Sequence, residues 1–168
     1  HTGADESVST LIRSGYIDAV LAGNALAVHD IEYATLGTSL GMNIRDGTLA
    51  VRGHRNHMEA INAVFKAGSI EKMVKSKKLR RGIMYECVKK KVPFVLAGSL
   101  RDDGPLPDVI TDVELAQKKY KEILKGASMV IMVATMLHSI ATGNMLPANV
   151  KVIVVDINQP TVTKLMDR

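Results

Sequence analysis

Four short runs of aliphatic residues, separated by segments with helical spacing, constrain the fold of this chain most. Continuous apolar runs are typical of parallel strands, because helices cover both faces of a parallel sheet. The runs are Ile17–Ala22, Phe94–Ala97, Met129–Ala134 and Val152–Val155. Helical patterns lie between them, over Asp5–Ser14, over His54–Ala67 and from a Thr111/Glu114 capping box to Gly126, whereas residues 36–53 are Gly-rich and indicate an excursion from the sheet. The alternation predicts an α/β fold with three layers around a mostly parallel sheet.

The length and the composition predict one soluble domain. A chain of 168 residues with 46 % apolar residues is long enough to bury a single core. The longest nearly apolar stretch, Met129–Leu137, is far shorter than the roughly 20 residues of a membrane helix. The single cysteine excludes an internal disulfide, so we expect a reducing cytoplasm. Because the chain begins with His1 rather than Met, we expect residues 1–168 to be one domain of a longer protein.

Positive charge is concentrated between Lys72 and Lys91, which contain nine basic residues against Glu86 alone. Such a block can contact nucleic acid or an acidic partner. Tyr85 is its one aromatic residue, and no nucleic-acid motif accompanies it. A solvated helical face is therefore the favoured interpretation, and we expect no nucleic-acid partner.

Small or polar residues follow every predicted strand. Ligands of open parallel sheets bind outside the carboxyl ends of the strands, where backbone amides point, so these residues indicate the floor of a crevice. VLAGN at Val20–Asn24 is echoed by VLAGS at Val95–Ser99, and a helix begins near Met136, where its amides would face a pyrophosphate. Asp156 ends the run VKVIVVD, the position of a carboxylate that binds ribose hydroxyls and disfavours NADP. No G-x-G-x-x-G occurs, and Asp156 can equally be a helix cap or a turn former.

The histidines and the cysteine leave alternatives open. His54 and His57 have metal-binding spacing, but no third ligand is evident, so we expect exposed polar side chains and no metal site. His29 and His138 fall near the predicted crevice, where an imidazole can move protons or merely pack. Cys87 is interpreted as a small buried residue.

The segments at these strand ends are similar to those of a known family. They are LAGNALAVHDIE (Leu21–Glu32), AGSLRDDGPLPDV (Ala97–Val109), ATMLHSIATGNMLP (Ala134–Pro147) and VVDIN (Val154–Asn158). They closely resemble the NAD-dependent ornithine cyclodeaminases long labelled LOR/SDH-like. The resemblance covers the whole chain. It implies a variant Rossmann domain related to deoxyhypusine synthase, which accounts for a dinucleotide site without the Gly fingerprint.

The resemblance also implies NAD contacts and a reaction. The implied contacts are Asn24, Ala25, Asp103, Thr135, Met136, Leu137, His138 and Asp156. The implied reaction is an NAD-dependent lyase reaction of arginine and proline metabolism, in which L-ornithine becomes L-proline and ammonia. Hydride leaves an amine-bearing carbon, the other amine attacks the resulting imine, ammonia departs, and the returned hydride restores NAD+. Family members are longer at both ends.

The catalytic groups are not fixed by any motif. We take Asp30 and Asp102 as the acids that bind the ammonium groups of ornithine and His29 as a proton shuttle. A homo-oligomer is expected. Two alternatives to the lyase stay open. One is an NAD-dependent amino-acid or amine dehydrogenase of the saccharopine type, and the other is a dinucleotide-binding regulatory domain without chemistry.

Overall fold

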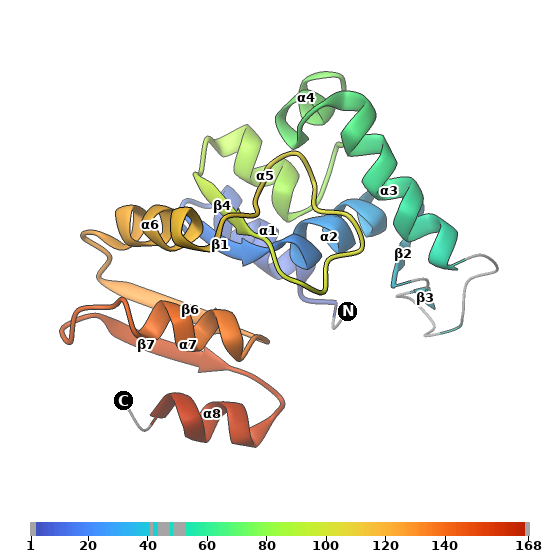
Figure 1. The fold of residues 1–168 in the computed structure, drawn as a ribbon. Coiled ribbons are helices and arrows are strands. Elements are labelled where there is room, and N and C mark those ends of the chain that lie inside the picture. The colour runs from blue at the N-terminus through green and yellow to red at the C-terminus, as the bar shows by residue number, and fades with distance from the viewer. Residues whose placement is uncertain (1–2, 41, 44–47, 49–52, 167–168) are drawn as a thin grey trace. The chain divides into compact units, whose positions relative to one another are not determined.

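The chain folds into two compact units, His1–Ala116 and Gln117–Arg168. The computed structural model describes residues 3–40, 42–43, 48 and 53–166, with the side chains of residues 53 and 54 excepted (Figure 1). None of the helices in these ranges combines the length and the hydropathy that a bilayer crossing requires. The boundary between the units falls within α6 (Val113–Leu124). That residues 1–168 act as one domain stays a prediction.

A three-stranded parallel sheet lies at the centre of the first unit. Its order is β1 (Val20–Gly23), β4 (Phe94–Ala97), β5 (Val109–Ile110). Gly23 pairs with Ala97, so the two echoed segments leave the sheet side by side. The prediction of a strand over Phe94–Ala97 is confirmed, β1 is shorter than the predicted run, and β5 was not predicted. These parallel strands confirm the predicted α/β class.

Five helices build the core of the first unit. They are α1 (Asp5–Arg13), α2 (Asn24–Leu36), α3 (Gly53–Ala67), α4 (Ile70–Lys75) and α5 (Ile83–Lys90). Figure 1 shows α2 beside the strands, and α2 packs against β1, β4, α3 and α5. Its side chains Ala27, Val28 and Ile31 are buried in the main core cluster. The sheet therefore holds α2 in place directly after the end of β1.

The region expected to be an excursion from the sheet contains a small hairpin. β2 (Thr38–Ser39) and β3 (Met42–Asn43) pair antiparallel, Thr38 opposite Asn43. Thr38 and Ser39 are buried although both are polar. The described residues of this region lie outside the main sheet, as the Gly-rich composition predicted, whereas residues 41, 44–47 and 49–52 lie outside the described part of the chain. Periodicity cannot detect a two-residue strand.

In its described residues, the second unit contains one pair of parallel strands, most of α6 and two further helices. β6 (Met129–Val133) pairs with β7 (Lys151–Val155), and they are followed by α7 (Leu137–Gly143) and α8 (Gln159–Met166) respectively. The predicted strands are confirmed, and the prediction that helices cover both of their faces stays a prediction for this pair. Val133 and Val155 are 49 % and 54 % exposed, and α8 packs against β7. That all four predicted strands share one sheet edge stays a prediction.

Two further expectations concern local features. The basic residues between Lys72 and Lys91 are all exposed, and Met73, Met84 and Cys87 in the same segment are buried, as a solvated face requires. That no nucleic acid binds there stays a prediction. The predicted N-cap of α6 is wrong by one residue. Asp112, not Thr111, accepts a hydrogen bond from the Leu115 amide at 2.8 Å, because an Asp side chain reaches the third amide of a helix equally well.

Candidate functional site

The end of β1 is fixed by a buried amide side chain. Asn24 is 4 % exposed and begins α2, whose N-cap residue Gly23 provides no side-chain hydrogen bond. The Asn24 Nδ2 donates to the Gly104 carbonyl at 3.4 Å, and its Oδ1 accepts from the Leu106 amide at 3.1 Å. Ala25 beside it is exposed. Asn24 thus holds the loop after β4 against the start of α2.

That loop contains two of the predicted site carboxylates. Asp102 is engaged locally, because it accepts hydrogen bonds from the Ser99 amide at 2.8 Å and from the Ser99 hydroxyl at 3.1 Å. Asp103 points outward, and its side chain is 68 % exposed. Of the two, Asp103 offers its carboxylate to solvent and to any ligand.

Asp30 lies within α2, and its buried side chain caps the beginning of α5. Its two carboxylate oxygens accept hydrogen bonds from the amides of Ile83 and Met84, both at 2.8 Å, at the beginning of α5. A Cβ atom at Gly82 would lie 2.7 Å from Oδ1 of Asp30, so this approach requires glycine there. Burial raises the pKa of Asp30 from 3.8 to about 6, although both amides lower it. These contacts give Asp30 a helix-capping role, and its assignment as a substrate-binding acid stays a prediction.

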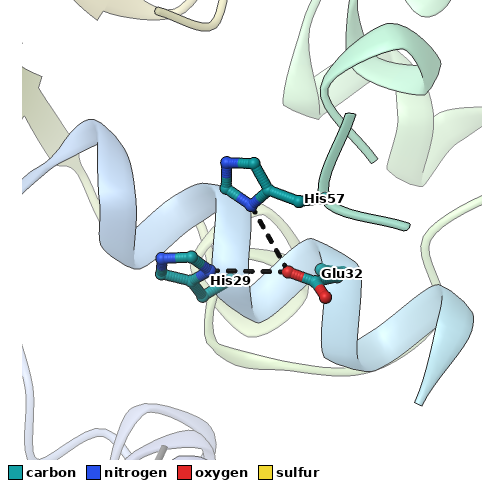
Figure 2. A group of neighbouring side chains, drawn as sticks. All are labelled: His29, Glu32 and His57. Atoms are coloured by element: carbon teal, nitrogen blue, oxygen red, sulfur yellow. Dashed lines mark hydrogen bonds and ion pairs between the residues drawn. The ribbon is translucent and has the colours of Figure 1, made fainter. Parts of the chain in front are cut away.

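His29, Glu32 and His57 form a cluster that the sequence did not predict (Figure 2). His29 and Glu32 lie on successive turns of α2, and His57 comes from the beginning of α3. Oε2 of Glu32 lies 3.5 Å from Nδ1 of His29 and 3.4 Å from Nδ1 of His57. The two ring centroids are 5.1 Å apart. Both imidazoles therefore turn the same nitrogen toward one carboxylate oxygen.

The carboxylate of Glu32 is fully buried and fixed by the hairpin. Its side chain is 0 % exposed, Oε1 accepts from the Thr38 hydroxyl at 2.8 Å, and Oε2 accepts from the Leu40 amide at 3.2 Å. Nε2 of His57 lies 3.9 Å from Oδ2 of Asp103, which connects the cluster to the loop after β4. The signal available in the sequence was a glutamate three residues after a histidine, a spacing that places both side chains on one face of a helix. The burial of Glu32 and its partner His57 on α3 are not evident from the sequence.

This cluster also bears on the expectation of no metal site. Its three ligand atoms lie within 4.8 Å of one another, and no second such group occurs in the residues that the structure describes. Structural zinc sites use four protein ligands, but catalytic zinc sites use three, and two histidines with one glutamate are one such set. The cluster therefore supplies the third ligand that the sequence did not reveal, and the absence of a metal stays a prediction. The side chain of His54, the other histidine of the predicted pair, lies outside the described residues.

The ends of β6 and β7 bring together the candidate residues of the second unit. Ala134 adopts a left-handed backbone conformation with φ of 52°, uncommon for a residue other than glycine and enriched at functional positions. Met136 and Leu137 are exposed, and Thr135 and His138 are partly buried. Nδ1 of His138 lies 3.3 Å from the hydroxyl of Tyr120, whose pKa burial raises to about 12. α7 has seven residues, and that its first amides face a pyrophosphate stays a prediction.

Asp156 is placed directly after β7 and partly exposed. Its Oδ1 accepts a hydrogen bond from the Asn158 amide at 2.7 Å. This bond orients the carboxylate, and a carboxylate at the end of a parallel strand is suited to bind two ribose hydroxyls. The turn-forming and the ribose-binding interpretations of Asp156 are therefore compatible.

Cys87, by contrast, does not take part in the chemistry of the site. It is fully buried, and burial raises the pKa of its thiol to about 12. Because the thiolate is the reactive form, this cysteine is inert at neutral pH, and its interpretation as a small core residue is confirmed.

Comparison with protein families identifies a match over the whole chain. Residues 1–168 match the family described as arginine dihydrolase ArgZ-like, C-terminal, Rossmann fold. An ornithine cyclodeaminase of Methanocaldococcus jannaschii is 59 % identical over 168 residues, which are 100 % of this chain and 40 % of that protein. The chain thus spans about two fifths of the length of such relatives.

Solved structures agree in fold. A conserved LOR/SDH protein of Methanococcus maripaludis superposes with a TM-score of 0.97 at 53 % identity, over 99 % of this chain and 51 % of that one. A ternary complex of AgrE with ornithine and NAD+ superposes with a TM-score of 0.94 at 56 % identity, over 98 % of this chain and 24 % of that one. These matches confirm the predicted Rossmann-type fold.

Proposed function

The chain belongs to the arginine dihydrolase ArgZ-like, C-terminal Rossmann-fold family, and from this we propose that it is the NAD-binding part of an ornithine cyclodeaminase. Support comes from a relative of that name that is 59 % identical over the whole chain. The observation that carries the proposal most directly is the close match to AgrE, whose structure contains both ornithine and NAD+. The reaction is the conversion of L-ornithine to L-proline and ammonia, which classifies the enzyme as a lyase.

In each unit, the residues at the strand ends fit contacts with part of a dinucleotide. In the first unit, the uncapped amides at the start of α2 suit a phosphate, and exposed Ala25 lets a ligand approach the backbone. In the second unit, the left-handed Ala134 turns the chain at the end of β6, and the Asp156 carboxylate suits a ribose. Asn24, Asp103 and the segment Thr135–His138 complete the proposed contacts.

NAD+ supplies a hydride acceptor that is restored within one reaction cycle, so no net oxidation occurs. The residues of this chain hold the cofactor, position the substrate and transfer protons. The reaction requires one proton to leave the amine that is oxidised and one proton to reach the nitrogen that departs as ammonia. We assign proton transfer to His29 and substrate ammonium binding to Asp30 and Asp102.

Asp102 is the stronger of the two acid candidates. Its hydrogen bonds come from Ser99 within the same loop, whereas both oxygens of Asp30 are occupied by amides of α5 in the core. Exchange of Asp102 should therefore raise the KM for ornithine more selectively than exchange of Asp30. The proposal also includes a homo-oligomer in a reducing cytoplasm, which suits the buried free thiol of Cys87.

NAD+ binding by the full-length protein tests this proposal. Wild-type protein should bind NAD+, and Asp156→Ala should weaken binding about ten- to a hundredfold, because hydrogen bonds to a charged group are lost. Glu122→Ala is the matched control, because Glu122 is an exposed carboxylate of the same unit paired with Lys119. Isothermal titration calorimetry measures all three affinities. Equal affinity of wild type and Asp156→Ala would contradict the assignment of the ribose site.

A further inference from the structure

The cluster around Glu32 contains a second imidazole that the proposed function does not yet use. We propose that His57 is a second proton-transfer residue of the ornithine reaction and that Glu32 positions both His57 and His29. This inference rests on the proposed function and extends it. It assigns to the pair the two proton transfers that the reaction requires.

The geometry of Glu32 is that of a fixed orienting group. Both of its oxygens are held by Thr38 and Leu40 of the hairpin, and its side chain is excluded from solvent. Figure 2 shows the two rings approaching the same oxygen from different helices. A carboxylate that faces Nδ1 fixes the tautomer of a histidine, because Nδ1–H then donates to the carboxylate. Both rings turn Nδ1 toward Glu32, so we assign proton exchange to Nε2 of each ring.

The position of His57 connects this pair to the proposed cofactor contacts. Its side chain is 12 % exposed, and that of His29 is 16 % exposed, so both rings are shielded without being sealed. Nε2 of His57 faces the carboxylate of Asp103, a proposed NAD contact in the loop that Asn24 holds. The proton-exchanging atom of His57 is therefore directed toward the loop where the cofactor is expected.

The charges of the cluster suit one acid and one base. A buried carboxylate without a partner is costly, and one imidazolium balances its charge. A second imidazolium would meet a like charge, since the ring centroids are only 5.1 Å apart. Because His57 also faces a second carboxylate, that of Asp103, we assign the role of the acid to His57 and the role of the base to His29.

The proton transfers complete a balanced reaction. Nε2 of His29 takes a proton from the substrate amine, and the C–H bond on the adjacent carbon then breaks with transfer of hydride, which oxidises the amine to an imine and reduces NAD+. The second amine loses a proton to water and forms a C–N bond to that carbon, while the π electrons of the C=N bond move onto the first nitrogen. The first C–N bond breaks as the departing nitrogen takes a proton from His57 and leaves as ammonia, and the ring nitrogen loses a proton to water and forms the C=N bond of the protonated cyclic imine. Returned hydride reduces this imine to proline and restores NAD+. His29 then gives its proton to water and His57 takes one from water, so both rings return to their starting state.

Substitution of His57 in the full-length protein is the test. His57→Ala should lower kcat by about a hundredfold or more, the usual contribution of a general acid or base, with unchanged NAD+ affinity. Added imidazole should restore part of the rate, because it replaces the missing ring. Glu32→Gln should also lower kcat, but imidazole should not restore it, because both rings are present and only their orientation is lost.

Two further variants control for structure. Glu59→Gln removes an exposed carboxylate two residues after His57 and should leave kcat unchanged. His57→Gln fills more of the space of the ring than alanine does and replaces His57→Ala if the latter does not fold. Thermal melting with and without NAD+ establishes folding of each variant.

The outcomes separate this inference from the proposed function. A wild-type protein that makes no proline overturns both. If the wild type is active, two results overturn the inference alone. One is a kcat of His57→Ala within about twofold of the wild-type kcat. The other is a folded His57→Ala variant whose lost activity imidazole does not restore. The inference is also overturned if metal analysis finds one divalent ion per chain that His57→Ala removes, because the three side chains would then be metal ligands.

Discussion

The two units hold their parallel strands in different surroundings. In the first unit Leu96 of β4 is 1 % exposed and belongs to a core cluster with residues of α2, α3, α4 and α5. In the second unit Val133 and Val155, at the ends of β6 and β7, are about half exposed. All of these residues come from similar aliphatic runs in the sequence. An aliphatic run therefore predicts a strand well, but it does not predict how much of that strand is buried.

The candidate groups of the two units also differ in how they are held. In the first unit, Asn24, Asp30 and Glu32 are buried side chains, and each contacts a residue far along the chain, which for Glu32 is His57. In the second unit, the backbone conformation of Ala134 and a local hydrogen bond of Asp156 set the geometry. Substitutions should thus affect stability mainly in the first unit.

The largest expected difference between the units is in the free energy of unfolding that is lost when a strand side chain is shortened. Leu96→Ala should lower the free energy of unfolding by about 2–5 kcal/mol, because it leaves a cavity in a closed core. Val133→Ala should lower it by about 1 kcal/mol or less, because half of that side chain is already in water. Urea unfolding of both variants measures the difference. Equal losses would show that the second pair of strands is as well packed as the first sheet.

The free energy of unfolding should depend on pH because of the buried carboxyl group of Asp30. Since its pKa is raised from 3.8 to about 6 in the folded state, folding binds a proton here. The stability contributed by this group is complete below about pH 4 and is lost as the pH rises through about 6, a change of up to about 3 kcal/mol. Asp30→Asn, which cannot titrate, should lack this change.

The measurement is urea unfolding of wild type and Asp30→Asn between pH 4 and pH 7. Glu122→Gln in the second unit is the control, since Glu122 is exposed and its lowered pKa comes from Lys119. A constant difference between wild type and Asp30→Asn across this range would contradict the burial of a titrating carboxylate.

A smaller effect is expected from Asn24. Asn24→Ala removes both side-chain hydrogen bonds to the loop after β4 and should lower the free energy of unfolding by about 1–3 kcal/mol. The Leu106 amide, which donates to Asn24, should exchange its hydrogen faster, whereas the Asn158 amide of the second unit should not change. Hydrogen exchange read by mass spectrometry detects both segments. Unchanged exchange at Leu106 would show that other contacts hold the loop.

The features that the sequence predicted well are local. The ranges of β4, β6 and β7 follow from aliphatic runs, and the start of α1 follows from acidic residues in its first turn. The predicted N-cap residue of α6 was wrong by one position. Asp112 caps this helix instead of Thr111, because neighbouring Thr and Asp side chains can both cap the start of a helix.

The features that the sequence did not predict join distant residues. Asp30 binds amides of Ile83 and Met84, more than fifty residues away, and Glu32 brings His29 to His57 from another helix. Such contacts depend on how α2 packs against α3 and α5, which periodicity does not specify. The NAD contacts at the strand ends came from a resemblance to a family, and direct binding measurements remain their test.

The central claim is that this chain serves a reaction in which NAD+ is restored in every cycle. The most direct measurement incubates the full-length protein with isotopically labelled ornithine and a limiting amount of NAD+, and follows labelled proline, ammonia and NADH together. We predict proline and ammonia in equal amounts, far in excess of the NAD+ supplied, without accumulation of NADH. Accumulation of NADH in step with product, or the absence of labelled proline, would contradict the claim.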